Sequence, residues 1–501
     1  MPQSNFRKLV FGAVCAIMAF EAAAGSGAET ARKNPYAVWK HPIKSVAPEY
    51  EVRVGGKEIG LLPVKVTILK QEPDPNDWGG TYWVASFPYS RGETVQVTSL
   101  AAPLDKTVFL PEGRVENVRH ASTNTLSFSS GGPFRVALER DGRVKPLILF
   151  GNAPDASVPD RTDPSVVYFG PGVHEAGRID LSSGQTLFID YGAVVYGGVN
   201  AKGDNVTICG HGVLSGAAYG RGKGPSATLL HAYGCRNLVV RDVTLTAPWG
   251  WTFSVQECDD VTIDGIRVCC SRMLNDDALD IVNSRNVTVR NSFFRAQDDL
   301  IAMKGYAEPR TPCGPVLVEN CDFWSDWANV FRIGGESHAS GMGRLTVRNV
   351  DILHSTPVTS PPFTARWPHA TFWIGSGAGM PMGDLLFENV RVRSEEASLY
   401  LAIVKSHVSV QGAAPGEIGA SGRKRVKIPY GGSVSNVVFR NIAVCGRSDY
   451  RIGVAGRSEK ESVRDVRFEN VMQNGRPVLR DSPLVEVGPH AEGVVFSSSA
   501  R

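Results

Sequence analysis

Two patterns of hydrophobic and polar positions divide the chain. Between about residues 30 and 155, short runs such as Y-E-V-R-V, V-Q-V-T-S-L and F-R-V-A-L-E-R alternate apolar and polar residues. Turn-forming segments such as G-G-K, P-D-P-N-D and R-D-G-R separate these runs. Period-two alternation in short strands with frequent turns predicts an antiparallel β-sandwich domain at residues 30–155. A linker rich in Pro and Asp closes this region near Pro164.

After Val166 the pattern becomes repetitive. A unit resembling N-V-x-V-x-N-x-x-V recurs, with its copies starting at Thr186, Asn205, Asn237, Asp260, Asn286, Pro315, Arg344, Asp384, Asn436 and Asp465. Strand-like units of this size, with Asn, Asp and Gly at the corners, predict a parallel β-helix over residues 165–495. The predicted fold class is therefore all-β. Insertions at about 355–383 and 405–433 lengthen two units, and we expect them to form loops beside a groove.

The stretch from Asn275 to Lys304 carries the candidate chemistry. It contains N-D-D-A-L-D-I and A-Q-D-D-L-I-A-M-K, with three acids at Asp277, Asp298 and Asp299. Asp277 precedes Asp298 by about one coil, and successive coils lie roughly 4.8 Å apart, so we expect Asp277 beside the other two. Close carboxylates repel and raise one another's pKa. Such a cluster either binds a cation or performs acid–base chemistry.

Hydrolysis of a glycosidic bond requires this kind of cluster. One carboxyl must protonate the leaving oxygen, and another must take a proton from water. Repulsion among three aspartates keeps one protonated while the others stay ionised. The hypothesis assigns Asp298 as general acid and Asp277 with Asp299 as the base pair that holds the water. A gap of roughly 6.5–9.5 Å between acid and base would leave room for that water and invert the anomeric centre.

The motifs also resemble a known group. The blocks W-T-F-S-V-Q-E-C-D-D-V-T-I, N-D-D-A-L-D-I, Q-D-D-L-I-A-M-K-G and F-R-I-G-G-E-S resemble glycoside hydrolase family 28, the polygalacturonases and their relatives, over roughly residues 165–480. A β-sandwich ahead of Y-F-G-P-G-V and G-V-L-S-G is similar to family 49, the dextranases and isopullulanases. The resemblance implies a right-handed β-helix, inverting hydrolysis by the three aspartates, and a substrate contact for Lys304.

Two departures from family 28 affect the substrate. Polygalacturonases carry a Gly-His-Gly block where this chain has Ala328 and Asn329. Their R-I-K block, which reads the galacturonate carboxylate, is replaced by A-T-F-W-I-G-S, and Arg366 or Arg332 is the candidate to take its place. The expected substrate is thus a polysaccharide or oligosaccharide, either pectic or a neutral α-glycan.

Six positions are predicted to contact that substrate. Aromatic rings cover the apolar faces of pyranoses, and the tryptophans are the candidate platforms, Trp367 in a Pro-rich loop being the better one. Arg332 and Glu336 lie in the coil after the acid pair and should face the same groove, with a surface ion pair as the alternative. The predicted substrate-binding residues are Lys304, Arg332, Glu336, Asn329, Trp251 and Trp367.

Composition narrows the partners. The 501 residues carry a formal net charge of +3, so no strongly basic face favours nucleic acid. Nine cysteines show no C-x-x-C spacing, which argues against a zinc site, and no metal or cofactor is predicted. Buried, stacked thiols are the expected state of the eight that follow Cys15, with a disulfide such as Cys313–Cys321 as the alternative.

The N-terminus predicts export. A basic start and a short apolar run precede A-A-A-G-S-G-A, the pattern of a signal peptide over residues 1–28 with cleavage between about Ala24 and Ala28. A membrane anchor is the alternative, but the apolar run is shorter than the roughly 20 residues that a span needs. We therefore predict a secreted or periplasmic monomer with no membrane association beyond this peptide.

Two other functions stay open from the sequence. A polysaccharide lyase on the same solenoid would use the acids to bind Ca²⁺ and Lys304 as the base. A non-catalytic carbohydrate-binding solenoid would use the acids only as corner caps.

Overall fold

The computed structural model of this chain describes residues 47–66, 80–140, 142–154, 158–271, 275–306, 311–355, 369–394, 400–408, 410–411, 426–427 and 430–498. These residues form 42 β-strands and no helix, which confirms the predicted all-β class. Accordingly, the described part of the chain has no helix long and apolar enough to cross a membrane. The predicted signal peptide and Trp367 lie outside the described residues.

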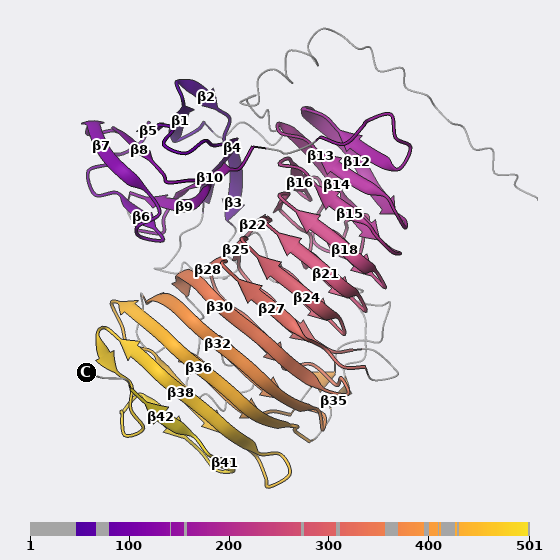
Figure 1. Cartoon of the computed structure of the whole chain (residues 1–501), viewed down its shortest axis with the longest axis vertical. Helices are drawn as coiled ribbons and strands as arrows, with labels where there is room; N and C mark the ends of the chain where they lie inside the picture. The colour runs from indigo at the N-terminus through magenta and orange to yellow at the C-terminus, as the bar shows by residue number, and fades with distance from the viewer. Residues whose placement is uncertain are drawn as a thin grey trace, which may run out of the picture.

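The N-terminal region is a sandwich of two five-stranded sheets, ordered β2-β1-β5-β8-β7 and β3-β4-β10-β9-β6 (Figure 1). Adjacent strands run antiparallel, except that β4 and β10 are parallel. The alternation seen in the sequence buries one face of each strand, as in the pattern of Tyr50–Val54. The strands are β1 Tyr50–Val54, β2 Lys57–Ile59, β3 Leu62–Val66, β4 Gly80–Pro88, β5 Val95–Ser99, β6 Val108–Leu110, β7 Glu116–Ser122, β8 Thr125–Ser129, β9 Phe134–Glu139 and β10 Leu147–Asn152.

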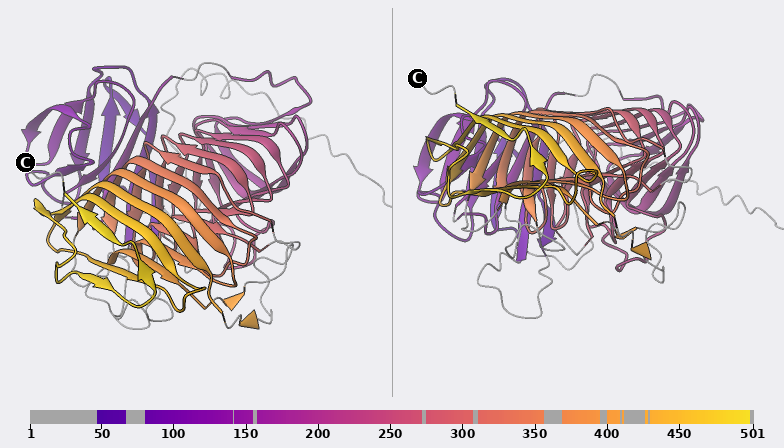
Figure 2. Two further views of the ribbon diagram at one scale, coloured as in Figure 1. Left: turned by 60° about the horizontal axis from the view of Figure 1, so that its bottom comes forward. Right: turned by 90° about the horizontal axis from the view of Figure 1, so that it is seen from below.

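The rest of the chain winds into a right-handed parallel β-helix, as predicted. Each complete coil contributes one strand to each of three faces (Figures 1 and 2). The first face, here called the corner face, begins each coil. It consists of β11 Val166–Phe169, β13 Thr186–Ile189, β15 Thr207–Cys209, β18 Arg236–Arg241, β21 Asp259–Asp264, β24 Arg285–Arg290, β27 Val316–Glu319, β30 Met342–Ser355, β32 Pro381–Ser394, β36 Ser433–Gly446, β38 Val463–Gln473, β41 Ala491–Glu492 and β42 Val495–Ser497.

The two other faces follow in order along each coil. The sandwich face, which meets the N-terminal domain, consists of β12 Gly172–Leu181, β14 Ala193–Ala201, β16 Val213–Ser215, β19 Thr244–Thr246, β22 Arg267–Cys269, β25 Phe293–Ala296, β28 Asp322–Ser325 and the second halves of β30, β32 and β36. The site face begins with the last residues of β14. It continues with the whole strands β17 Leu230–Tyr233, β20 Phe253–Gln256, β23 Leu279–Val282, β26 Ile301–Lys304, β29 Phe331–Gly334, β31 Ala370–Ser376, β33 Tyr400–Ser406, β37 Arg451–Ala455 and β40 Val485–Val487. The remaining strands are β34 Val410–Gln411, β35 Val426–Lys427 and β39 Arg476–Pro477.

The sequence repeat marks the corners of the coils. Eight of its starting residues have positive φ, namely Asn205, Asn237, Asp260, Asn286, Arg344, Asp384, Asn436 and Asp465. Asn and Asp tolerate this left-handed conformation better than other residues with a side chain. A second set of corner asparagines forms a ladder in which Nδ2 of Asn389 donates to Oδ1 of Asn349, and Nδ2 of Asn441 donates to Oδ1 of Asn389. The repeat therefore records corner geometry and stacking between coils.

Stacked side chains fill the interior of the coils. The rings of Phe387, Phe439 and Phe468 form one stack, with successive centroids 5.0 and 4.9 Å apart. Such offset rings add to the burial of apolar area that holds neighbouring coils together. All eight described cysteines are free, and only Cys445 is exposed, so Cys313 and Cys321 form no disulfide.

The sandwich packs directly against the sandwich face of the solenoid (Figures 1 and 2). Tyr82 of β4 and Trp324 of β28 belong to one buried apolar cluster that joins the two domains. The Arg295 guanidinium lies between these rings, 4.1 Å from each centroid, and pairs with Asp326 at 2.9 Å. The Tyr82 hydroxyl donates to the carbonyl of Cys270 at 3.0 Å. The contact therefore combines apolar burial with a fully enclosed ion pair.

One expected insertion is partly wrong. The sequence assigns residues 355–383 to a projecting loop, but residues 370–376 form β31, a fully buried strand of the site face. Its run A-T-F-W-I-G-S lacks the Asn-rich corner that makes the other strands recognisable. Residues 356–368 lie outside the described residues.

Candidate active site

The three predicted acids converge at the edge of the site face. Asp277 immediately precedes β23, and Asp298 and Asp299 precede β26, the next strand of that face. The amide of Ala278 donates to the carbonyl of Asp299 at 2.8 Å, which places Asp277 and Asp299 in register on neighbouring coils. One carboxylate oxygen from each of the three acids lies within 4.8 Å of the other two. These oxygens are closer than the gap of roughly 6.5–9.5 Å expected between acid and base.

The first aspartate of N-D-D holds this arrangement in place. Oδ1 of Asp276 accepts hydrogen bonds from the amides of Gln297 and Asp298, at 2.9 and 3.0 Å. Its Oδ2 accepts from the amide of Ser271 at 3.0 Å. A buried carboxylate bonded to backbone amides fixes the chain on both coils. Asp276 therefore ties the segment before β26 to the one before β23.

Asp298 is the acid that remains partly open to solvent. Its Oδ2 accepts from the amide of Asn275 at 2.9 Å, and its Oδ1 accepts from the amide of Asp299 at 3.0 Å. Desolvation, together with repulsion from Asp277 and Asp299, raises the pKa of Asp298 well above its usual value. A protonated, accessible carboxyl is what a general acid requires.

Asp277 is almost completely enclosed, with 2% of its surface exposed. Its Oδ2 accepts from Nζ of Lys304 at 2.8 Å, whereas its buried Oδ1 has no hydrogen-bond partner among the described residues. Burial and the Asp299 charge raise the pKa of Asp277 to about 6, against the opposing effect of the Lys304 ammonium. A buried oxygen without a partner is costly, so this atom is well suited to accept a proton from a bound water.

Asp299 is fixed by the next coil. Its Oδ1 accepts from Nδ2 of Asn329 at 2.6 Å and from the amide of Asn329 at 3.2 Å. Oδ1 of Asn329 in turn accepts from the amide of Ala370 at 2.8 Å. Asn329 is thus oriented through both ends of its amide, and it holds a buried carboxylate that is 8% exposed.

The other predicted groove residues lie near the triad at different depths. The half-buried Trp251 ring covers Lys304, with Nζ 4.0 Å from the ring centroid. Arg332 is only 6% exposed, and its guanidinium lies 3.5 Å from the centroid of Trp373. Glu336 is partly exposed. Arg332 is therefore buried rather than at the surface, and substrate contacts by these residues stay predictions.

Three titratable residues that the sequence did not single out lie on or beside the site face, near Asp277, Asp299 or Arg332. Asp280 is fully buried, with Oδ1 2.6 Å from Nζ of Lys304. Burial and Arg332 lower the pKa of His369 to about 4, against the effect of Asp299. Burial and Arg332 likewise lower the pKa of Lys405 to about 7. Only Asp280 had a usable signal, because the alternation of L-D-I puts Leu279 and Ile281 inside and Asp280 outside.

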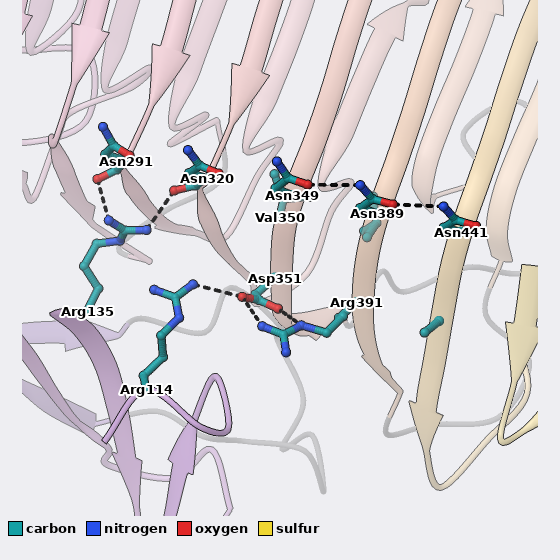
Figure 3. Close-up of a pocket in the computed structure, with 12 residues that line it drawn as sticks. Arg114, Arg135, Asn291, Asn320, Asn349, Val350, Asp351, Asn389, Arg391 and Asn441 are labelled. Carbon is teal, nitrogen blue, oxygen red and sulfur yellow. Dashed lines mark hydrogen bonds and ion pairs between the residues drawn. The ribbon is translucent and has the colours of Figure 1, made fainter. Parts of the chain in front are cut away.

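A separate cleft of about 570 Å³ lies between the sandwich and the corner asparagines (Figure 3). Arg135 donates to the carbonyls of Asn291 and Asn320, at 2.9 and 2.8 Å. Arg114 pairs with Asp351 at 3.0 Å, and Arg391 pairs with the same carboxylate. Because its guanidinium groups bond to the solenoid itself, the cleft serves the contact between the two domains and carries none of the predicted site residues.

Comparison with known proteins agrees with this description. The model of Glycosyl hydrolases family 28 matches residues 189–326, which include all three aspartates and confirm the resemblance to that family. Dex49A from Penicillium minioluteum shares the fold, with a TM-score of 0.59 and 13% identity over 90% of this chain and 96% of that chain. The family match therefore supports a glycoside hydrolase-like region at residues 189–326, and the likeness to Dex49A shows a shared fold.

Two further solved structures are similar to this chain. An exopolygalacturonase from Thermotoga maritima has 16% identity and a TM-score of 0.46, covering 66% of this chain and 83% of that chain. A family 28 exopolygalacturonase from Yersinia enterocolitica has 14% identity and a TM-score of 0.45, covering 91% of this chain and 95% of that chain. No curated protein matches the sequence.

Proposed function

We propose that this protein is an exported glycoside hydrolase that cleaves a polysaccharide or oligosaccharide with inversion at the anomeric carbon. The observation that carries the proposal is the convergence of three carboxylates within 4.8 Å, one partly exposed and two enclosed. Acid and base roles require carboxyls whose environments differ in this way. Asp298 is the general acid, and Asp277 with Asp299 forms the base.

The reaction uses the triad in one concerted step. The Asp298 carboxyl gives its proton to the glycosidic oxygen as the bond from the anomeric carbon to that oxygen breaks. A water between Asp277 and Asp299 attacks the anomeric carbon and loses its proton to that pair. Oδ1 of Asp277, which has no hydrogen-bond partner among the described residues, accepts this proton, since Oδ2 already accepts a hydrogen bond from Lys304. Release of the new sugar hydroxyl and proton exchange with solvent restore Asp298.

Inversion is favoured by exposure rather than by the distance between the acids. A retaining enzyme needs a carboxylate oxygen that reaches the anomeric carbon and bonds to it. Asp277 and Asp299 are 2% and 8% exposed, so they can admit a water but not a sugar carbon. Proton NMR of the first-formed anomer tests this point, and a product with the same configuration as the substrate would contradict it.

The lyase alternative fits the site less well. A lyase base must take a proton from carbon, so its amine must be neutral when substrate binds. Lys304 is buried between Asp277 and Asp280, and against the effect of burial the Asp277 carboxylate raises the pKa of its ammonium well above the usual value. Lys304 is therefore a permanent cation and a poor base.

A substrate panel tests the function directly. Dextran, pullulan, polygalacturonate, rhamnogalacturonan and α-galactosides are incubated with the protein, and new reducing ends are measured alongside ultraviolet absorbance. We expect reducing ends without the absorbance of an unsaturated uronate on at least one substrate, and loss of turnover in Asp298→Asn. The matched control is Asp260→Asn, an exposed corner aspartate that should keep full activity. Retained turnover in Asp298→Asn would reject the assigned acid, and binding without turnover on the whole panel would favour a carbohydrate-binding protein.

Export rests on the sequence pattern of residues 1–28. Expression of the whole chain and of a variant lacking residues 1–28 in a Gram-negative host, followed by cell fractionation, tests it. We expect the whole chain in the periplasm or medium with a shortened N-terminus by mass spectrometry, and the truncated variant in the cytoplasm. An uncleaved chain in the membrane fraction would support the anchor instead.

A further inference from the structure

Besides the triad and Asp276, the acid site contains a further carboxyl, Asp280, that faces the same side of the solenoid as the triad. Asp280 on β23 is in register with Ala302 on β26, and Lys304 is in register with Val282. Lys304 therefore reaches back by one coil, over the small side chain of Ala302. Its Nζ lies 2.8 Å from Oδ2 of Asp277 and 2.6 Å from Oδ1 of Asp280. One ammonium thus bridges a predicted catalytic carboxylate and a carboxyl with no assigned role.

The contact of Lys304 with Asp277 and Asp280 is shielded from solvent. The Trp251 ring covers the ammonium, whose Nζ is 4.0 Å from the ring centroid. Lys304 and Asp280 are 4% and 0% exposed. Lysine is a flexible chain with three rotatable donors, so a fixed position requires acceptors on more than one side. Asp280 supplies the second oxygen, with Oδ1 at ion-pair distance from Nζ, although neither of its oxygens makes a hydrogen bond of good geometry among the described residues.

Stability alone does not account for Asp280. Enclosing a carboxyl is costly, and its Oδ2 has no hydrogen-bond partner among the described residues. Replacing a whole buried ion pair by apolar residues of similar size is often neutral or stabilising, so folding does not require Lys304 and Asp280 as a pair. A group that weakens folding and touches the partner of Asp277 is better explained by the reaction.

We propose that Asp280 is a positioning residue for hydrolysis: its Oδ1 fixes the Lys304 ammonium against Asp277, so that Asp277 stays ionised as half of the base pair. The inference rests on the proposed function. The charged or titratable groups around Asp280 and Lys304 are Asp277 beside β23, Asp298 and Asp299 before β26, and Tyr306 after it. Burial and the Asp277 charge raise the pKa of Asp280 well above its usual value, so it acts as a neutral acceptor and leaves the ammonium charge to Asp277.

Two substitutions of Asp280 distinguish its effect on the position of Lys304 from the effect of its own charge. Asp280→Asn keeps an oxygen acceptor of the same shape without a charge, and Asp280→Leu removes the acceptor. The acid limb is the rise of kcat/KM with pH as Asp277 ionises. We expect its midpoint in Asp280→Asn to stay within a few tenths of a pH unit of the wild-type midpoint. In Asp280→Leu the Lys304 ammonium loses its second oxygen partner and is no longer fixed beside Asp277. The midpoint of the acid limb should then rise by about 1 pH unit or more, since a nearby opposite charge typically lowers a carboxyl pKa by 1–3 units.

The matched control breaks a buried ion pair elsewhere. Asp326→Asn loosens Arg295 at the sandwich contact and should leave the acid limb in place whatever it does to stability. An unmoved limb in Asp280→Leu would overturn the proposal, as would a shift of equal size in Asp280→Asn. Circular dichroism verifies that each variant is folded before the kinetics are compared.

A titration without substrate separates this inference from the proposed function. With ¹³C-labelled aspartate carboxyls, the Asp277 resonance is assigned by its loss in Asp277→Asn and followed with pH. We expect the Asp277 midpoint to rise in Asp280→Leu and to stay in Asp280→Asn, whether or not any panel sugar is cleaved. Failure of the panel alone would reject the glycosidase, whereas an unmoved midpoint in Asp280→Leu would reject the role of Asp280.

Discussion

Replacing Asp277 by Asn should abolish activity and make the folded protein more stable. The folded-state pKa of Asp277 is about 6, against an ordinary value of 3.8. Each pKa unit corresponds to about 1.4 kcal/mol, so ionising Asp277 costs the folded state about 3 kcal/mol, a figure that already includes the attraction of Lys304. Because the folded pKa is the higher one, this contribution to stability is full below pH 3.8 and is lost as pH rises through 6. Asn is neutral at every pH and escapes the loss.

The expected shift in melting temperature follows from chain size. An unfolding entropy of about 2.1 cal/mol/K per residue over 501 residues gives roughly 1 kcal/mol/K. Asp277→Asn should therefore melt about 3 °C above the wild type at pH 7.5, and the two should melt together near pH 3.5. The same variant should lose a factor of about 10² to 10⁴ in kcat, since half of the base pair is gone.

Thermal unfolding followed by circular dichroism at both pH values is the assay. Asp326→Asn is the control of opposite sign, because it leaves the buried Arg295 without its carboxylate and should cost about 3–5 kcal/mol at pH 7.5. A melting temperature of Asp277→Asn at or below the wild type at pH 7.5 would refute the reasoning, as would a gain that persists unchanged at pH 3.5.

Three further predictions concern the surroundings of the triad. Asn329→Ala should lower kcat about tenfold or more with little change in KM, because Asp299 loses the amide that orients it; steady-state kinetics with an Asn349→Ala control on the corner ladder measure this, and an unchanged kcat would contradict it. The kcat/KM profile should rise with pH through a midpoint near 6 as Asp277 ionises, and a flat profile between pH 5 and 7 would oppose that assignment. Gly375→Ala should cost about 1–3 kcal/mol of stability, since a Cβ there would lie 2.2 Å from the Trp373 ring; Gly220→Ala, which meets open space, is the comparison in thermal melts.

The corners of the solenoid were predictable because corner geometry selects residue types. Asn and Asp tolerate the left-handed backbone, so Asn237 or Asn286 signals a coil without any partner being known. The approach of Asp277 to Asp298 followed from coil length alone. Both inferences depend on local or periodic properties of the chain.

What the sequence could not predict depends on partners from distant segments. Lys304 was expected to contact substrate, and the structure places it between Asp277 and Asp280. The parallel pairing of β4 with β10 needs sheet topology rather than alternation. Strand β31 lacks an Asn-rich corner, so its apolar run was assigned to an insertion instead of a buried rung. In each case the deciding contact joins residues that no short motif links.

The position of Arg135 gives the N-terminal domain a mechanical role. A solenoid in which each coil touches only its neighbours can open at any junction. The Arg135 guanidinium donates to the carbonyls of Asn291 and Asn320, which belong to successive windings, the first between Asp277 and Asp298 and the second after Asp299. The β-sandwich therefore bridges two successive windings next to the aspartates, and we expect its removal to weaken the contact between these windings even though every predicted catalytic side chain remains in the protein.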